Sequence, residues 1–160
     1  VAIEAKPSLG SIDNLRRMSD RGENAGLGIV QSDVLGYLKR SQSTESQQIA
    51  SKLRMIAPFY AEEVHIIARR DIKSVAELSG KRIVVGTDGS GTMLTATNLF
   101  GLLGVKPGNL YKVSPPEGVV AVLTGQADAA LFVGGKPVKL FKNMEQLAAP
   151  GTPNAKAHAQ

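Results

Sequence analysis

The stretch IVVGTDGSGTMLTATNLFGLLG, residues 83–104, joins two kinds of secondary structure. A β-branched apolar run is followed by a glycine-rich turn, and the turn leads into apolar residues at helical spacing. Two similar units follow: a strand at 110–113 with a helix at 117–123, and a strand at 129–133 with a helix at 137–147. Strands that alternate with helices in this way predict an α/β fold built on a parallel sheet.

The turn DGSGT, residues 88–92, lies between a predicted strand at 82–85 and a predicted helix at 92–103. Its glycines leave no side chains in the way of an approaching ligand. The first N–H groups of a helix have no partner within the helix and lie at its positive end. The turn therefore predicts a site for a carboxylate or phosphate. The alternative, which the residues leave open, is that Ser90 or Thr92 caps the helix and the glycines only form the turn.

The same turn does not match the phosphate-binding motifs of nucleotide cofactors. A Walker loop needs a lysine after its last glycine, where this chain has Thr92 and then Met93. A dinucleotide fingerprint needs a third glycine where this chain has Leu94. With two distant histidines, His65 and His158, and no cysteine, a transition-metal site is not expected either. We expect no cofactor and no enzymatic activity.

The part of the chain before residue 70 predicts a second set of elements. Strands are expected at 1–5 and 26–31, and helices at 13–20 and from Ser32 onward. The polar segment 41–51 is expected to be a flexible loop or a solvated helix.

Composition limits the partners. The chain has 160 residues, a net charge of +5 and a pI near 9.6, and its basic residues form no block. Only 4% of the residues are aromatic, so few side chains are suited to stacking on bases. We therefore expect no nucleic-acid partner, and no apolar run approaches the length of a membrane span.

Several stretches together resemble one family. "SLGSIDNLRRMSDRGENAGLGIVQSDV", "LRMIAPFYAEEVHIIARRDIKSVAELSGKRIVVGTDGSGT" and "GVVAVLTGQADAALFVGGKPV" are similar to the solute-binding receptors of TRAP transporters, specifically the TAXI group. The resemblance covers most of residues 1–140. It implies a type II periplasmic-binding-protein fold, in which two α/β lobes close on a small solute in the cleft between them.

The resemblance also implies which residues bind the solute. The first lobe would contribute the GS..N and QSD positions and the aromatic residue before the crossover, and the second lobe its two glycine turns. Asp33 would receive a substrate ammonium, although helix capping accounts for it equally well. The implied ligand-binding residues are Ser11, Asn14, Gln31, Ser32, Asp33, Tyr60, Ser90, Gly91, Thr92, Gly134 and Gly135.

The implied role is capture of a small organic anion or amino acid, in the class of glutamate, glutamine and dicarboxylates, for delivery to membrane permease subunits in the periplasm. The family's receptors are longer than this chain. We therefore expect an internal fragment with a partial first lobe at 1–68, a second lobe at 69–147 and a disordered or truncated tail at 148–160. Such a fragment is a candidate for pairing with another copy.

Two other classes of function remain open on the sequence. A phosphoribosyltransferase-like enzyme would hold a phosphate in the GSGT turn and would need a magnesium-binding carboxylate, for which Asp88 is the candidate. The effector-binding domain of a transcription regulator would use the same fold beside a DNA-binding helix-turn-helix.

Overall fold

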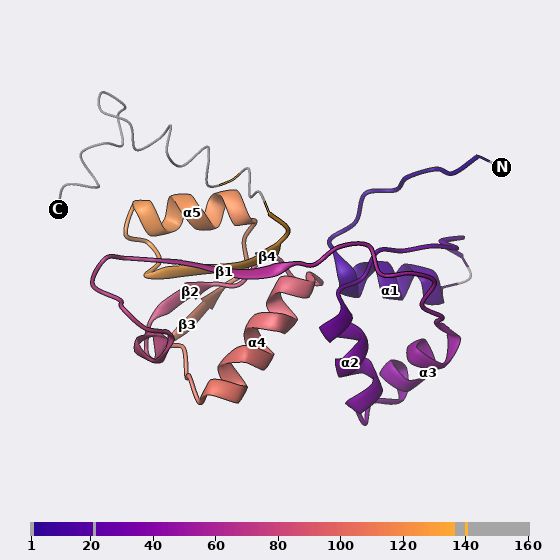
Figure 1. Cartoon of the computed structure of the whole chain (residues 1–160), viewed down its shortest axis with the longest axis horizontal. Coiled ribbons are helices and arrows are strands. Elements are labelled where there is room, and N and C mark those ends of the chain that lie inside the picture. The colour runs from indigo at the N-terminus through magenta and orange to yellow at the C-terminus, as the bar shows by residue number, and fades with distance from the viewer. Residues whose placement is uncertain (1, 21, 137–139, 141–160) are drawn as a thin grey trace. The chain divides into compact units, whose positions relative to one another are not determined.

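The computed structural model describes residues 2–20, 22–136 and 140, and it divides into two compact units. Unit 1 comprises Val1–Pro58 and Thr87–Thr95, and unit 2 comprises Phe59–Gly86 and Ala96–Gln160. Figure 1 shows the elements of both units. The lobes predicted at 1–68 and 69–147 stay a prediction, and the predicted tail at 148–160 lies outside the described residues.

Unit 2 is built on a four-stranded sheet. Its strands are β1 (Glu63–Ala68), β2 (Arg82–Val84), β3 (Asn109–Tyr111) and β4 (Ala129–Gly134), in the order β1-β4-β2-β3. β2 is parallel to both of its neighbours, whereas β1 pairs antiparallel with β4. The predicted α/β class with a parallel sheet is therefore confirmed, and β1 adds one antiparallel edge strand.

Helices connect the parallel strands of this sheet. α4 (Gly91–Leu103) follows β2, and α5 (Pro115–Leu123) follows β3, as the sequence predicted. A short 3-10 helix, η1 (Val75–Leu78), precedes β2. Apart from Leu140, the helix predicted at 137–147 lies outside the described residues.

The core of unit 2 lies on both faces of the sheet. On one face Val84 and Ala130 pack with Val122 of α5, and a Cβ atom added at Gly118 would come within 2.8 Å of Val84 Cγ1. Ile83 is fully buried and faces the opposite side, because neighbouring residues of a strand alternate. Figure 1 shows α5 over one face of the sheet and the later turns of α4 over the other.

Unit 1 is built on helices. α1 (Ser11–Ser19), α2 (Ser32–Arg40) and α3 (Thr44–Lys52) are each followed by a residue with extended backbone. Their shared core consists of Leu15, Val34, Leu38 and Ile49, together with Leu94 from the first turn of α4. α3 covers residues 44–51 of the polar segment 41–51 and extends to Lys52, so the solvated-helix alternative is the one that the structure shows.

The strands predicted at 1–5 and 26–31 are wrong. Among the described residues of unit 1 no strand is formed, and both segments are irregular. A segment forms a strand only where a neighbouring strand supplies hydrogen bonds and side-chain contacts, and none of the described strands pairs with these segments. Leu27 and Ile29 consequently remain exposed, at 65% and 60%.

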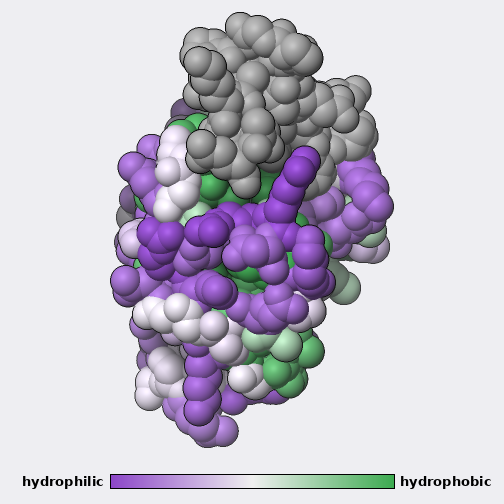
Figure 2. Space-filling view, turned by 90° about the vertical axis from the view of Figure 1, so that its left-hand side faces the viewer, coloured by the Kyte–Doolittle hydropathy of each residue, from purple (hydrophilic) through white to green (hydrophobic). Residues whose placement is uncertain are grey.

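The surface carries hydrophilic residues, several of them in ion pairs, as well as exposed apolar side chains. Figure 2 shows one face on which hydrophilic residues predominate. Ion pairs of unit 1 include Arg17–Asp13 at 3.1 Å, and those of unit 2 include Arg82–Asp128 at 2.9 Å. Within the described ranges, no helix combines the length and the apolar character that a membrane span requires.

Candidate functional site

The N-termini of α1, α2 and α4 meet in unit 1. The carbonyl of Gly89, just before α4, accepts the N–H groups of Ile12 and Asp13 in the first turn of α1, at 3.1 and 3.3 Å. The hydroxyl of Ser11 at the start of α1 accepts the N–H of Gln31 just before α2, at 3.0 Å. We call this meeting point the N-terminal junction. It brings the positive ends of three helix dipoles together.

Gly91 lies at the tightest point of the N-terminal junction. The place where a Cβ atom would project from Gly91 is occupied by Oε1 of Gln31, and such an atom would lie 2.9 Å from Oγ of Ser11. Ser11 is only 7% exposed. A side chain at position 91 would therefore have to displace the Gln31 side chain and crowd the Ser11 hydroxyl.

Two further glycines shape the junction through their backbones. Gly10 has φ +120° and Gly89 has φ +78°, a region that L side chains rarely adopt. A Cβ atom at Gly10 would also lie 3.1 Å from Cα of Ser90. The positive φ angles and the close approach explain why the chain carries glycine at both positions.

Asp33 is held by two donors. The N–H of Val34 donates to Oδ1 at 2.9 Å, and the hydroxyl of Thr95 donates to Oδ2 at 2.5 Å. The Thr95 hydroxyl also lies 3.0 Å from the carbonyl of Gly91. The Asp33 carboxylate thus links the first turn of α2 to the first turns of α4.

Of the remaining predicted residues in unit 1, Ser90 accepts the N–H of Met93 at 3.2 Å, so it caps α4. The side-chain amide of Asn14 donates to the carbonyl of Ile29 at 2.8 Å. Ser32 is exposed at the start of α2, and Thr92 is half-buried in α4. The capping interpretation of Ser90 is therefore present in the structure, and the hydroxyl keeps a hydrogen of its own to donate.

A second group of predicted residues lies together in unit 2. A Cβ atom added at Gly135 would lie 3.5 Å from Cδ2 of Tyr60, so the tyrosine ring packs beside the glycine turn. Nε2 of His65 lies 3.2 Å from the carbonyl of Gly134, and the Lys136 amine pairs with Glu63 at 2.8 Å. Tyr60, Gly134 and Gly135 thus form one local cluster at the ends of β1 and β4.

The acidic residues are distributed unequally among the three helices of the N-terminal junction. Asp13 lies in the first turn of α1 and Asp33 in that of α2, whereas the first turn of α4 has no acidic residue. The N–H of Leu9 donates to Asp13, and this hydrogen bond, with help from Arg17, holds the pKa of the Asp13 carboxyl below its usual value. The α4 N-terminus is therefore the end best suited to receive an anion from outside.

Sequence reasoning missed Thr95 and Gly10. Thr95 follows Gly91 by one helical turn, so the two share a helix face, and that spacing could have indicated the contact. Gly10 is the glycine of the GS..N motif, but its contact with Ser90 joins residues that are distant in the sequence and could not be predicted.

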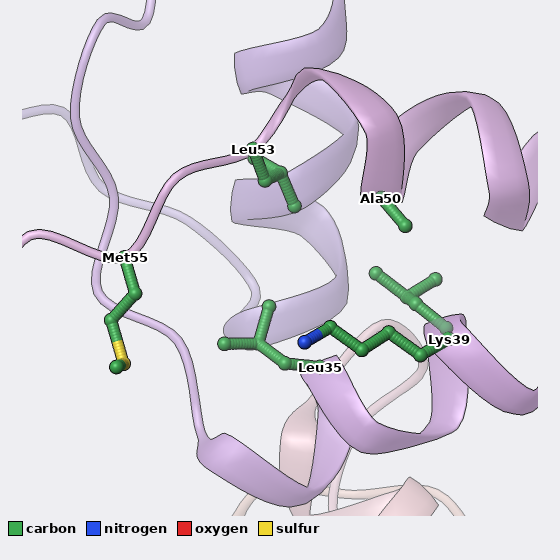
Figure 3. A pocket seen from close by; sticks show the side chains of 6 residues that line it. Leu35, Lys39, Ala50, Leu53 and Met55 are labelled. Carbon is green, nitrogen blue, oxygen red and sulfur yellow. The ribbon is translucent and has the colours of Figure 1, made fainter.

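A hydrophobic cavity of about 100 Å³ lies elsewhere in unit 1, between α2 and α3. Figure 3 shows its lining, in which Lys39 is the exception to the apolar side chains of Leu35, Leu53 and Met55. It includes none of the residues predicted to bind solute. Among the described residues no group of three or more His, Cys, Asp or Glu side chains is placed to hold a metal.

Residues 1–152 match the sequence profile of the NMT1-like family. The chain belongs to the NMT1-like family. This family is periplasmic-binding-like, which agrees with the α/β architecture of unit 2.

Solved structures with partial similarity include two ligand complexes. The CcmR regulatory domain of Synechocystis PCC6803 in complex with 2-PG is 22% identical, with a TM-score of 0.39 over 58% of this chain and 43% of that one. The GluR0 ligand-binding core from Nostoc punctiforme in complex with L-glutamate is 26% identical, with a TM-score of 0.36 over 54% of this chain and 36% of that one. The NMT1-like chain thus spans less than half the length of either protein.

Proposed function

We propose that this NMT1-like chain is the solute-binding part of a TAXI-type TRAP transporter receptor. It would bind a small organic anion or amino acid such as glutamate, without chemical change, and deliver it to membrane permease subunits in the periplasm. The observation that carries this proposal is the N-terminal junction, where the ends of α1, α2 and α4 meet around Gly91. Converging helix N-termini offer N–H groups and partial positive charge to a carboxylate.

The side chains at the junction suit a solute that also carries an ammonium group. Asp33 supplies a carboxylate whose oxygens already accept hydrogen bonds, so the carboxylate is fixed in orientation. Ser32 is exposed beside it. A zwitterion can therefore place its carboxylate toward α4 and its ammonium toward Asp33, whereas a simple dianion gains nothing from Asp33.

The experiment is a thermal melt of the chain with L-glutamate, L-glutamine, succinate, and phosphoribosyl pyrophosphate plus magnesium. A solute at about 100 times its dissociation constant adds roughly 2.7 kcal/mol to the native state, which gives a measurable rise in Tm. We expect a rise with one amino acid or carboxylate and none with the pyrophosphate. A rise with phosphoribosyl pyrophosphate alone would reject the receptor in favour of a transferase-like enzyme.

A pair of matched variants tests whether the solute that raises Tm binds at the N-terminal junction. Asp33→Asn keeps the shape of the side chain and removes its charge, so it should weaken binding of L-glutamate more than binding of succinate. Asp71→Asn changes an exposed carboxylate of unit 2 and serves as the control. If Asp33→Asn lowered the affinities for L-glutamate and for succinate equally, recognition of an ammonium group by Asp33 would be ruled out.

A further inference from the structure

The side chain of Gln31 fills the N-terminal junction in this structure. Gln31 is the last residue before α2, and its backbone N–H is fixed by Oγ of Ser11. Its side-chain oxygen, Oε1, occupies the place where a Cβ atom would project from Gly91, the first residue of α4. The carboxamide therefore contacts α4 where that helix begins, and the buried Ser11 closes the same space.

The amide oxygen of Gln31 resembles a carboxylate oxygen of a solute in its chemistry. An amide oxygen is a hydrogen-bond acceptor with partial negative charge, and a helix N-terminus favours such an atom. α1 and α2 carry Asp13 and Asp33 in their first turns, but the first turn of α4 has no acidic residue. Ser90 already caps the N–H of Met93, and the Gln31 oxygen is a second acceptor, which the chain places directly beside Gly91.

We propose that Gln31 is a tethered stand-in for the solute: its side-chain oxygen holds the place of a solute carboxylate oxygen at Gly91 and leaves when the solute binds. This inference rests on the proposed function. Binding is then a competition between a neutral amide attached to the chain and a charged carboxylate in solution. The apparent affinity is reduced by the fraction of molecules in which Gln31 occupies the place.

The test compares three substitutions at position 31 by calorimetric titration with L-glutamate and with succinate. Gln31→Asn shortens the side chain by one methylene, so its amide falls short of Gly91, and asparagine is a favoured residue before a helix, which preserves folding. Gln31→Ala removes the amide altogether. Because the Gln31 oxygen no longer competes for the place beside Gly91, both variants should bind about fivefold tighter than the unmodified chain.

Gln31→Glu gives the opposite expectation. It places a tethered carboxylate at Gly91, which competes better than the amide, so affinity should fall at least fivefold. Gln47→Ala makes the same amide deletion on the exposed face of α3 and should leave the affinity unchanged.

The outcomes separate the two proposals. Weaker binding by both Gln31→Asn and Gln31→Ala would mean that Gln31 contacts the solute directly, which overturns the stand-in and leaves the receptor standing. No binding by any variant or by the unmodified chain would reject the receptor, and the stand-in with it.

A stability measurement tests the contact without any solute. Gly91→Ala should lower Tm in the unmodified chain and lower it less in the Gln31→Ala background, because the overlap with Gln31 is then removed and only the approach to Oγ of Ser11 remains. Equal decreases in the two backgrounds would overturn the stand-in whatever the binding experiments show.

Discussion

Unit 1 and unit 2 are each stabilised by a different kind of internal contact. In unit 2 the strands β1 to β4 satisfy one another's backbone groups, and apolar side chains pack on both faces of their sheet. In the described part of unit 1 there is no sheet, and the ends of helices are joined instead through a carbonyl, a hydroxyl and a carboxylate. Unit 2 therefore depends mainly on buried area, and unit 1 depends to a larger degree on single polar contacts.

This difference predicts different responses to mutation. Loss of a buried side chain in a sheet removes transfer free energy and leaves a cavity. Loss of one polar partner at a helix end costs less, but it leaves the other partner unsatisfied. Leu131→Ala in unit 2 and Thr95→Val in unit 1 test this contrast, and Asp128→Asn measures a polar contact of unit 2 for comparison with that of unit 1.

Leu131→Ala is expected to have the largest effect. Leu131 lies in β4, is 2% exposed and pairs with Ile66 of β1. The lost burial and the cavity should lower the free energy of unfolding by about 3 kcal/mol, measured by urea denaturation. Hydrogen exchange should show faster exchange of the amides in β1 to β4.

Leu102→Ala makes the same change at a position that is 85% exposed, and it should leave stability within about 0.5 kcal/mol. Similar losses for the two variants would mean that the sheet of unit 2 contributes little to stability, and the contrast between the units would fail.

Asp128→Asn should have the next largest effect. Arg82 donates to the Asp128 carboxylate through its side chain and its backbone N–H, and these hydrogen bonds lower the pKa of Asp128 to about 2. The usual value is 3.8. The difference corresponds to about 2 kcal/mol of stability at neutral pH, which the amide would lose.

The pH dependence has a definite sign. Because the pKa is lower in the folded state than in the unfolded state, the stabilisation is complete above pH 3.8 and is lost as the pH falls toward 2. Urea denaturation at pH 7 should separate Asp128→Asn from the unmodified chain, and at pH 2 the two should converge. A constant difference across that window would show that the ionised carboxylate is not the source.

Asp71→Asn is the control for this pair of measurements. Asp71 also pairs with Arg69, but its side chain is 58% exposed, and exposed ion pairs contribute little. It should show little loss of stability at either pH.

Much of unit 2 could be predicted from the sequence because its signals are local. β2 and β4 lie in continuous apolar runs, as expected of buried strands, and α4 and α5 have apolar residues at helical spacing; each is bounded by glycine or proline. The parallel arrangement of β2 and β4 follows from the alternation of strands and helices along the chain. The antiparallel pairing of β1 could not be predicted, because it joins Glu63 to Gly134 across a long separation in the sequence.

Unit 1 was predicted less well for the same reason. The residues of segments 1–5 and 26–31 favour strands, but a strand needs a partner, and pairing is not a local property. At the N-terminal junction, local features could be predicted from the sequence and long-range contacts could not. The glycine turn at Gly89 and Gly91 was visible as a helix start, whereas its contacts with Ser11 and Gln31 depend on packing that only the structure reveals.

Thr95→Val is the smallest of the three changes and the most direct test of unit 1. Valine has nearly the shape of threonine but cannot donate to Asp33, so the carboxylate loses one of its two donors. The expected cost is about 1 kcal/mol of stability, and Thr95→Ser, which keeps the hydroxyl, should recover most of it. If a single polar contact matters in unit 1 as proposed, Thr95→Val should also weaken L-glutamate binding, because a mobile Asp33 carboxylate no longer faces the solute ammonium in a fixed orientation. A variant as stable and as strongly binding as the unmodified chain would show that the junction is held by packing, in the same way as the sheet.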